Sequence, residues 1–216
     1  NGTLLHPSGG GINVISETPE WVAVKADAGV DWDSFVLWCV ENGYWGAENL
    51  SNIPSQTGAA PVQNIGAYGA EAKDIVTSVE MLSSDSLTEI TMASKYCSFG
   101  YRDSIFKHML RGRVIITAVN FRLSKIAAPN LSYGALADEV EKLGGPTLTN
   151  IRQAVLDIRA SKLPDPTELG NAGSFFKNPV VDFGTAGKLR TGYPGMPEYR
   201  AQEEGMVKLS AGWLIE

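Results

Sequence analysis

The chain has 216 residues, of which 44% are hydrophobic, so it holds enough apolar material for one large domain or two modest ones. Its 18 Lys and Arg residues face 24 Asp and Glu residues, which gives a formal net charge of −6. This acidic balance argues against a general nucleic-acid or anionic-membrane surface, because either would favour a basic face. Any anionic ligand must therefore be held by a few local cations.

Cysteine and histidine are scarce, and their positions exclude several kinds of site. Cys39 and Cys97 lie far apart with no C-x-x-C pair, and His6 and His108 are the only histidines. We therefore expect no metal site and no disulfide framework, but two buried, reduced thiols. There is no apolar run long enough to span a membrane, and the first residues lack the pattern of a signal peptide. Both ends are abrupt, so we expect a piece of a longer cytoplasmic protein.

The first predicted elements are short strands at 3–7, 12–17 and within 21–29, with the turn SGGG between the first two. Residues 31–43 then carry apolar side chains at helical spacing, with Asp31 suited to the N-cap and Gly43 to the C-terminal turn. The opening of the chain is therefore of the α+β class.

Three consecutive glycines at 9–11 resemble a loop that cradles phosphate. A phosphate-binding loop follows an apolar strand and opens a helix, whereas here His-Pro-Ser precedes the glycines and a strand follows them. A hairpin turn is the better interpretation.

Residues 46–74 are rich in Gly, Ala, Ser, Asn and Pro, with few charges and no sustained period. The small side chains around Asn64, Gly66 and Gly69 would let backbone N–H groups approach phosphates or the edge of a ring system. A tightly packed crossover filled by small side chains explains the same composition equally well. The composition alone leaves both interpretations open.

Strand character returns at 74–82 and 113–123, with a turn at 83–89 between them, and helices are predicted at 132–145 and 149–162. The second helix places Ile151, Ala154, Val155 and Ile158 on one stripe. From residue 164 the chain becomes rich in loops. We therefore predict a domain boundary there, between residues 1–163 and 164–216.

Several polar side chains could carry chemistry, and each also has a purely structural explanation. Within CSFGYRDSIFKH (97–108), Arg102 beside Tyr101 could hold a carboxylate in a bidentate grip, or it could simply pair with Asp103 in a surface turn. Lys162 could merely complement a helix C-terminus, and Tyr133 could be a core aromatic. GNAGSFFKNP (170–179) could be a turn that runs into a short buried strand.

Taken together, the segments resemble one family. In their order and spacing, residues 46–74, 97–108, 161–166, 170–181 and 207–216 are similar to the UDP-N-acetylenolpyruvoylglucosamine reductases, the MurB flavoenzymes of bacterial peptidoglycan synthesis. The likeness runs nearly end to end, and the YRDS segment is typical of the longer, type I form. It implies an α+β fold, with part of an FAD-binding type 2 (PCMH-like) domain over 1–163 and the start of an α+β substrate-binding domain over 164–216.

The resemblance implies an FAD- and NADPH-dependent oxidoreductase. NADPH reduces FAD, and hydride then passes from flavin N5 to the enolpyruvyl methylene of UDP-N-acetylglucosamine enolpyruvate, which gives UDP-N-acetylmuramate. Such an enzyme serves cell-wall biogenesis, cell shape and cell division in the bacterial cytoplasm. We expect a monomer with no nucleic-acid or membrane partner.

Site residues follow from the motifs. Ser174, in GNAGSFFKNP, matches the serine that donates the proton, and Arg102 matches the arginine that holds and polarises the enolpyruvyl carboxylate. The positions that line the substrate or its UDP group are matched by Tyr101, Tyr133, Lys162, Asn178 and, more loosely, Tyr199. The flavin-contacting positions are matched by Ser55, Thr57, Gly58, Asn64, Ile65, Gly66 and Tyr68.

Two elements of the family pattern are not found in the chain. The GGGSN-like flavin loop falls upstream of its first residue, and the catalytic glutamate falls beyond its last, so Glu216 is not assigned that role. One alternative is therefore a catalytically incomplete UDP-sugar-binding module or a merely folded domain. Another is a flavin-domain protein that acts on a different substrate, although YRDS together with GNAGSFFKNP argues against it.

Overall fold

The computed structural model describes residues 6–162, 168–170, 176–201 and 203–215, which fall into two compact units, residues 1–162 and 163–216. Both units mix helices and strands, so the α+β class is confirmed. The elements of the first unit are β1 (Ile12–Glu17), β2 (Trp21–Asp27), α1 (Trp32–Glu41), η1 (Glu48–Leu50), η2 (Thr57–Ala59), β3 (Gly66–Ala67), β4 (Ala70–Glu71), η3 (Ala72–Asp74), β5 (Val76–Ser83), β6 (Glu89–Ala93), η4 (Ser94–Tyr96), η5 (Ile105–Lys107), β7 (Val114–Ser124), α2 (Gly134–Lys142) and α3 (Leu148–Lys162). Those of the second are β8 (Val180–Asp182), α4 (Phe183–Gly192), β9 (Glu198–Arg200), β10 (Met206–Leu209) and α5 (Ala211–Ile215).

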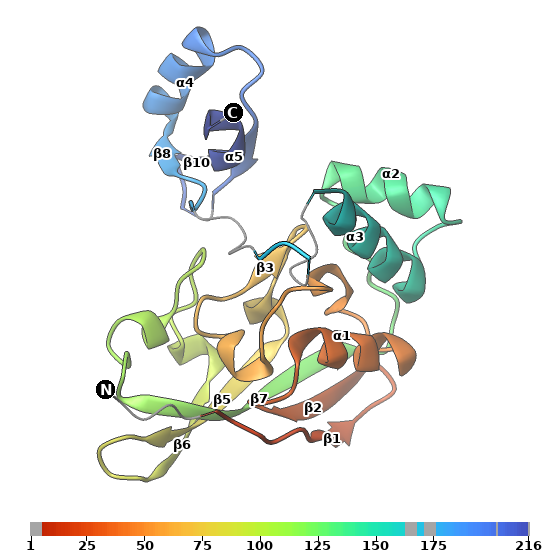
Figure 1. Cartoon of the computed structure of the whole chain (residues 1–216), viewed down its shortest axis with the longest axis vertical. Helices are drawn as coiled ribbons and strands as arrows, with labels where there is room; N and C mark the ends of the chain where they lie inside the picture. The colour runs from red at the N-terminus through yellow and green to blue at the C-terminus, as the bar shows by residue number, and fades with distance from the viewer. Residues whose placement is uncertain (1–5, 163–167, 171–175, 202, 216) are drawn as a thin grey trace. The chain divides into compact units, whose positions relative to one another are not determined.

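A five-stranded antiparallel sheet, ordered β1-β2-β7-β5-β6, is the framework of the first unit (Figure 1). Along β2 every second residue is buried, which places Val22, Val24 and Ala26 on the inner face. The other face is polar, since Lys25 pairs with Glu80 at 2.5 Å and Asn120 donates to the same carboxylate at 3.0 Å. The sheet thus has one apolar and one polar face, as antiparallel sheets commonly do.

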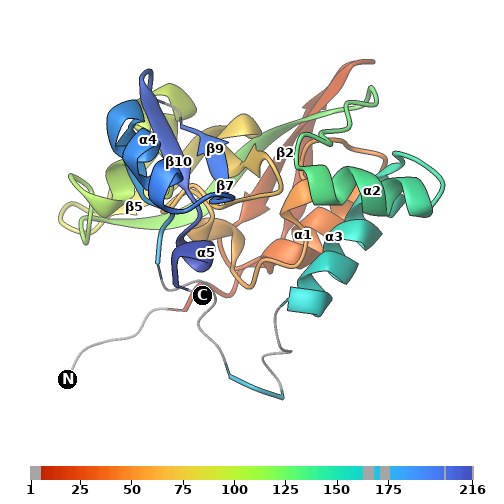
Figure 2. The ribbon, with the colours of Figure 1, turned by 90° about the horizontal axis from the view of Figure 1, so that it is seen from above.

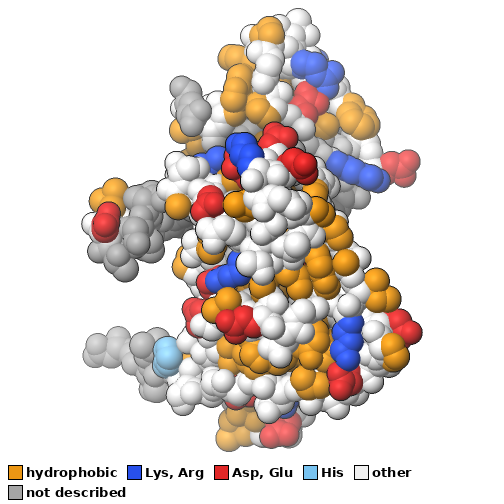
Figure 3. Space-filling model, turned by 90° about the vertical axis from the view of Figure 1, so that its right-hand side faces the viewer, with side chains coloured by type: hydrophobic (Ala, Val, Ile, Leu, Met, Phe, Trp, Pro, Cys, Tyr) orange, Lys and Arg blue, Asp and Glu red, His pale blue; other side chains and the backbone are white. Residues whose placement is uncertain are grey.

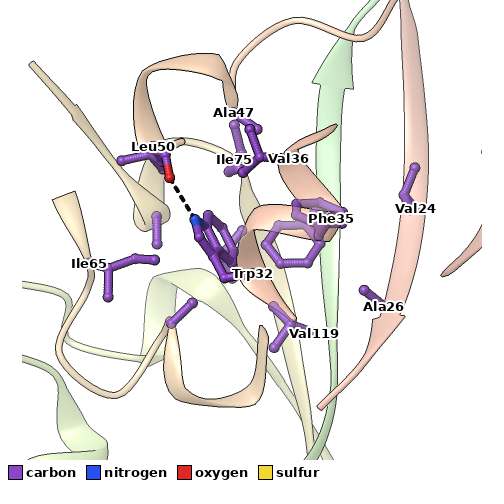
Figure 4. Packing of buried hydrophobic residues seen from close by; sticks show 14 of the residues in the cluster. Val24, Ala26, Trp32, Phe35, Val36, Ala47, Leu50, Ile65, Ile75 and Val119 are labelled. Atoms are coloured by element: carbon purple, nitrogen blue, oxygen red, sulfur yellow. Dashed lines mark hydrogen bonds between the residues drawn. The ribbon is translucent and has the colours of Figure 1, made fainter. Parts of the chain in front are cut away.

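Helix α1 packs against the inner face of this sheet (Figure 4). Its Asp31 N-cap accepts from the Ser34 N–H at 2.8 Å, as its sequence predicts. The ring centroids of Phe35 and Phe121 lie 4.5 Å apart, and the Trp32 indole donates to the Leu50 carbonyl at 2.9 Å. Through this bond the helix anchors the start of the segment 46–74 in the core.

Helices α2 and α3 form a hairpin beside α1 (Figure 2). They share a separate apolar cluster whose members include Leu136, Val140, Ile151 and Val155. Tyr68 and Tyr133 pack partly buried at its edge. The α2–α3 hairpin therefore has an apolar core of its own, with two tyrosines at its edge.

The second unit is a small α+β body. Its three strands are antiparallel in the order β8-β10-β9, and α4 begins at Asp182, whose carboxylate accepts from the Thr185 N–H at 2.8 Å. The buried core of this unit, within the part of the chain that the structure describes, is Ala186, Met196, Val207 and Leu209. It is much smaller than the core of the first unit.

Most predicted elements are confirmed, including the two strands at 12–17 and 21–27 and all three helices of the first unit. Residues 3–5 of the first predicted strand lie outside the described residues, and His6 to Gly11 form no regular element. The three glycines run directly into β1 and open no helix, but residues 8–11 form no turn either, so the hairpin turn predicted there is not found. Both cysteines are buried and free, as expected.

Charge is mixed on the surface. On the face shown in Figure 3, Lys and Arg side chains lie among Asp and Glu side chains and do not gather into one basic area. Within the described ranges, no group of three or more His, Cys, Asp or Glu residues is placed to hold a metal ion. No helix in those ranges is both long enough and apolar enough to cross a bilayer.

Candidate active site

The short β3–β4 hairpin, residues 66–71, is the centre of the candidate site. It is shaped by left-handed backbone at Tyr68, with φ 47°, and at Gly69, with φ 84°. A Cβ atom on Gly69 would lie 2.5 Å from Ser132 Oγ, so both the backbone angle and the close approach require glycine there. Three further segments, around Arg102, Asn130 and Arg159, contact this hairpin.

Arg102 lies against the start of the hairpin. Its guanidinium donates to the Gly66 carbonyl and lies 5.4 Å from the centroid of the Tyr101 ring. A Cβ atom on Gly66 would lie only 2.8 Å from Arg102 Nη1, so glycine makes room for the arginine. A guanidinium has five N–H donors, which leaves a bidentate grip on a carboxylate open to it.

The loop that carries Arg102 is tied to the glycine-rich segment. Asn64 donates to the Gly100 carbonyl at 3.0 Å, and Ser104 Oγ donates to the Val62 carbonyl at 2.6 Å. Both side chains are buried. The candidate arginine and the segment predicted to face the flavin are thus joined by side-chain hydrogen bonds, although they lie far apart in the sequence.

Tyr68 links the hairpin to helices α2 and α3. Its ring meets Tyr133 edge-on, with centroids 5.3 Å apart and an interplanar angle of 87°. Burial raises the pKa of the Tyr68 phenol above its usual range, although the nearby Arg159 guanidinium acts in the opposite direction. The phenol therefore stays neutral near pH 7 and can donate a hydrogen bond.

Two asparagines hold the tip of the hairpin. Asn49 donates to the carbonyls of Tyr68 and Asn130 at 2.8 Å each, and Asn130 donates to the Gly69 carbonyl at 3.0 Å. These bonds satisfy the carbonyls of Tyr68 and Gly69, which lie in a strained turn at the end of a sheet of only two short strands. The hairpin is therefore fixed from outside.

The predicted flavin-contacting residues fall into two groups by burial. In the buried group each backbone N–H already donates to a protein carbonyl at 2.8 to 3.3 Å; this group is Thr57, Gly58, Asn64 and Ile65. Ser55, Gly66 and Tyr68 are half-buried. The buried group therefore supports the segment from within the core, whereas the half-buried group reaches the surface of the segment.

The remaining predicted residues lie elsewhere. Lys162 is exposed at the last residue of α3, in the first unit. Asn178 and Tyr199 belong to the second unit, where Asn178 Oδ1 accepts from the Ala211 N–H at 2.9 Å and Lys208 Nζ lies 6.0 Å from the Tyr199 ring centroid. Ser174 lies outside the described residues. The structure thus brings Arg102, Tyr101, Tyr133 and the hairpin together within one unit, and the roles of all the predicted site residues stay predictions.

Strained backbone gathers in the two segments that form this site. Of the six non-glycine residues with positive φ in the described chain, four lie in residues 53–69 and 97–108: Asn64, Tyr68, Ser98 and Arg102. Each such angle costs about 1–3 kcal/mol and persists only when surrounding contacts enforce it. This concentration points to a site whose geometry is held by the fold.

Sequence reasoning missed several residues that shape the site: Asn49, Ser104, Asn130 and Arg159. A buried asparagine or serine gives no pattern of its own, because its partner is distant in the chain. Arg159 gave one weak signal, its position three residues before Lys162, which places both cations on one face of α3.

Comparison with known proteins defines the class first. Residues 1–90 match the family model described as an FAD binding domain. The crystal structure of the UDP-N-acetylenolpyruvylglucosamine reductase (MurB) from Thermus caldophilus aligns with a TM-score of 0.53 at 24% identity, over 86% of this chain and 61% of that one. Residues 1–90 are therefore similar to an FAD-binding domain, and the chain shares the fold of the Thermus caldophilus structure.

Curated relatives match this chain over its whole length. UDP-N-acetylenolpyruvoylglucosamine reductases are 45% identical in Bacteroides fragilis YCH46, 47% in Neisseria meningitidis Z2491 and 46% in Pseudomonas putida KT2440. The alignments cover 99–100% of this chain and 63–64% of the relatives. Over its whole length the chain is therefore similar to UDP-N-acetylenolpyruvoylglucosamine reductases, and it spans somewhat less than two thirds of the length of these relatives.

Proposed function

We propose that the chain supplies one flavin-facing wall and the carboxylate-binding arginine of an NADPH-dependent reductase that converts UDP-N-acetylglucosamine enolpyruvate to UDP-N-acetylmuramate. The observation that carries this proposal is the hydrogen bond from the Arg102 guanidinium to the carbonyl of Gly66, within the segment 46–74. The similarity to curated reductases at 45–47% identity supports the choice of substrate.

FAD fits the half-buried surface of the hairpin, where glycine and alanine at positions 66 and 67 leave the backbone accessible. When bound, FAD would take a hydride from NADPH and deliver it to the enolpyruvyl methylene. Ser55, Gly66 and Tyr68 would lie at this surface, with Thr57, Gly58, Asn64 and Ile65 behind them.

Arg102 would hold the enolpyruvyl carboxylate and stabilise the enolate-like charge that develops on it. Ser174 would donate the proton to the adjacent carbon, a task that a hydroxyl can perform only when it is held against a strongly basic carbon. Tyr101, Tyr133, Lys162, Asn178 and Tyr199 would bind the rest of the substrate and its UDP group. The product would enter peptidoglycan synthesis in the bacterial cytoplasm, and we expect the enzyme to act as a monomer.

The test uses the full-length flavoenzyme and follows flavin absorbance in a stopped-flow instrument. In Arg102→Ala, reduction by NADPH should be unchanged, whereas reoxidation by the enolpyruvyl substrate should slow about 10²–10³-fold. Ser174→Ala should likewise keep flavin reduction and lose product formation.

Arg122→Ala is the matched control, because that arginine lies on the β7 strand, 5.2 Å from the Trp21 ring centroid, outside the candidate site. Its two half-reactions should match those of the wild type. A wild-type rate of reoxidation in Arg102→Ala would refute the carboxylate-binding role.

A further inference from the structure

The loop at 100–104 is attached at both ends to one short stretch of chain, residues 62–64. At one end Asn64 Nδ2 donates to the Gly100 carbonyl at 3.0 Å, and at the other Ser104 Oγ donates to the Val62 carbonyl at 2.6 Å. Arg102 lies midway between the two attachments. We propose that Asn64 and Ser104 are positioning residues, a two-point clamp that fixes the Arg102 guanidinium, and this inference rests on the role of Arg102 proposed above.

The Asn64 side chain has no capacity left for a second task as a donor. Its amide also donates to Glu71 at 3.0 Å, and its Oδ1 accepts from the Lys73 N–H at 2.9 Å. The residue is fully buried and has left-handed backbone, with φ 45°, which asparagine tolerates better than most residues. Asn64 therefore acts through the loop that it binds.

Ser104 closes the other end of the loop. It is 1% exposed, and besides its bond to Val62 it accepts from the Phe106 N–H at 3.2 Å, which caps η5. Between these anchors, Gly100 and Asp103 exchange backbone hydrogen bonds of 3.0 and 3.2 Å, which closes a tight turn. The turn gives Arg102 its left-handed φ of 54°.

A clamp is needed because this arrangement is costly. A left-handed arginine costs about 1–3 kcal/mol of strain, so the turn would relax to other conformations if its ends were released. Relaxation would move the guanidinium away from the Gly66 carbonyl, and a shift of about 1 Å at a reacting group can cost on the order of 10²-fold in rate.

Two substitutions release the clamp by different means. Ser104→Ala removes the hydroxyl. Asn64→Asp keeps the shape and the acceptor for the Lys73 N–H but removes the donors to Gly100 and to Glu71, and it places a second carboxylate beside Glu71. The matched controls are Ser51→Ala, whose buried hydroxyl donates to the Glu48 carbonyl at 2.7 Å, and Asn120→Asp, whose amide donates to Glu80 at 3.0 Å.

The experiment measures both half-reactions and the unfolding temperature of the full-length flavoenzyme. We expect each clamp variant to slow flavin reoxidation by the enolpyruvyl substrate about 10- to 100-fold. Ser104→Ala, which lies outside the predicted flavin-contacting residues, should leave reduction by NADPH within about twofold. The controls should lower the unfolding temperature without changing either half-reaction. In an Arg102→Ala background, Ser104→Ala should cause no further slowing, because the two changes would then act through one group.

Three results would overturn the clamp. The first is a wild-type rate of reoxidation in both clamp variants. The second is equal slowing of both half-reactions by Ser104→Ala, and the third is full additivity of Ser104→Ala with Arg102→Ala. The Arg102→Ala variant is measured first. If it reoxidises at the wild-type rate, the proposed role of Arg102 fails and the clamp fails with it, whereas a slow Arg102→Ala beside normal clamp variants refutes the clamp alone.

Discussion

Glycine at position 66 and arginine at position 102 depend on each other. The glycine has no side chain where the guanidinium lies, and its carbonyl accepts from that guanidinium. The conformation of the β3–β4 hairpin and the position of the arginine in a distant loop are therefore coupled. This pairing explains why a segment with few charges can still present a positive group at its surface.

Gly66→Ala tests this dependence. The added Cβ would lie 2.8 Å from Arg102 Nη1 and 2.9 Å from the Ala70 carbonyl oxygen, so either the arginine or the hairpin must shift. We expect a loss of about 1–3 kcal/mol in the free energy of unfolding, measured with urea on the 216-residue chain. Gly10→Ala is the control, because nothing lies within 4 Å of its added Cβ, and it should be nearly neutral. Equal stabilities of the two variants would contradict the steric argument.

For individual residues, the sequence predicted the important motifs better than it predicted the role of each side chain. Arg102 and Tyr101 were found because YRDS resembles a known motif, and the structure places the Arg102 guanidinium on the Gly66 carbonyl and near the Tyr101 ring. For the segment 46–74, composition could not separate close approach to a ligand from tight internal packing, and the structure shows internal packing at Thr57, Gly58 and Ile65. Hydrogen-bond partners that lie far apart in the chain cannot be read from one sequence.

Between elements, an ion pair joins α1 to α3. Arg152 donates to both oxygens of Asp33 at 2.7 Å, and the Asn52 N–H donates to the same carboxylate at 2.5 Å. Burial opposes ionisation of Asp33, but these donors outweigh it and hold its pKa below the usual range. The pair therefore supports the helix that carries Arg159.

The pH dependence of stability should reveal this pair. Because the folded pKa of Asp33 is lowered, its contribution is present above the ordinary aspartate value of about 3.9 and is lost as the pH falls through the folded pKa. Asp33→Asn should cost about 1–3 kcal/mol in unfolding free energy at pH 7, and the gap to the wild type should close in acid. Asp157→Asn, at an exposed carboxylate on α3, is the control. A gap that stays constant from neutral to acidic pH would count against the assignment.

The elements that the sequence predicted have a clear period or a clear cap. Strand β2 alternates, α1 carries Asp31 as its cap, and α3 has an apolar stripe. Helix α4 was not predicted, because its sequence FGTAGKLRTG has three glycines and only one buried residue, Ala186. Its Asp182 cap, with threonine three residues later, was the signal that could have revealed it.

The two units of the chain differ in the size of their cores. The first buries Trp32, Phe35 and Phe121 under a five-stranded sheet, whereas the second, within its described residues, buries no aromatic side chain. Small bodies bury a smaller fraction of their surface and are correspondingly less stable.

Hydrogen exchange should separate the two units. In the 216-residue chain we expect the amides of β10 to exchange faster than those of β2 and β7, because local opening of the small core costs less free energy than global unfolding of the large one. Mass spectrometry of peptides from each strand gives the comparison. Protection of β10 equal to that of β7 would mean that the second unit unfolds only together with the first.

The double attachment of residues 100–104 also limits how the chain can change in length. An inserted residue between Gly100 and Ser104 could not be absorbed by sliding either end, since both ends are bonded to residues 62–64. It would have to bulge at Arg102 itself. In the hairpin turn between β5 and β6, the hydrogen bonds of residues 85–88 stay within residues 83–88 and Leu87 is 70% exposed, so an insertion there would cost little. Among relatives that carry the YRDS segment, differences in length should therefore accumulate in that turn and avoid the arginine loop.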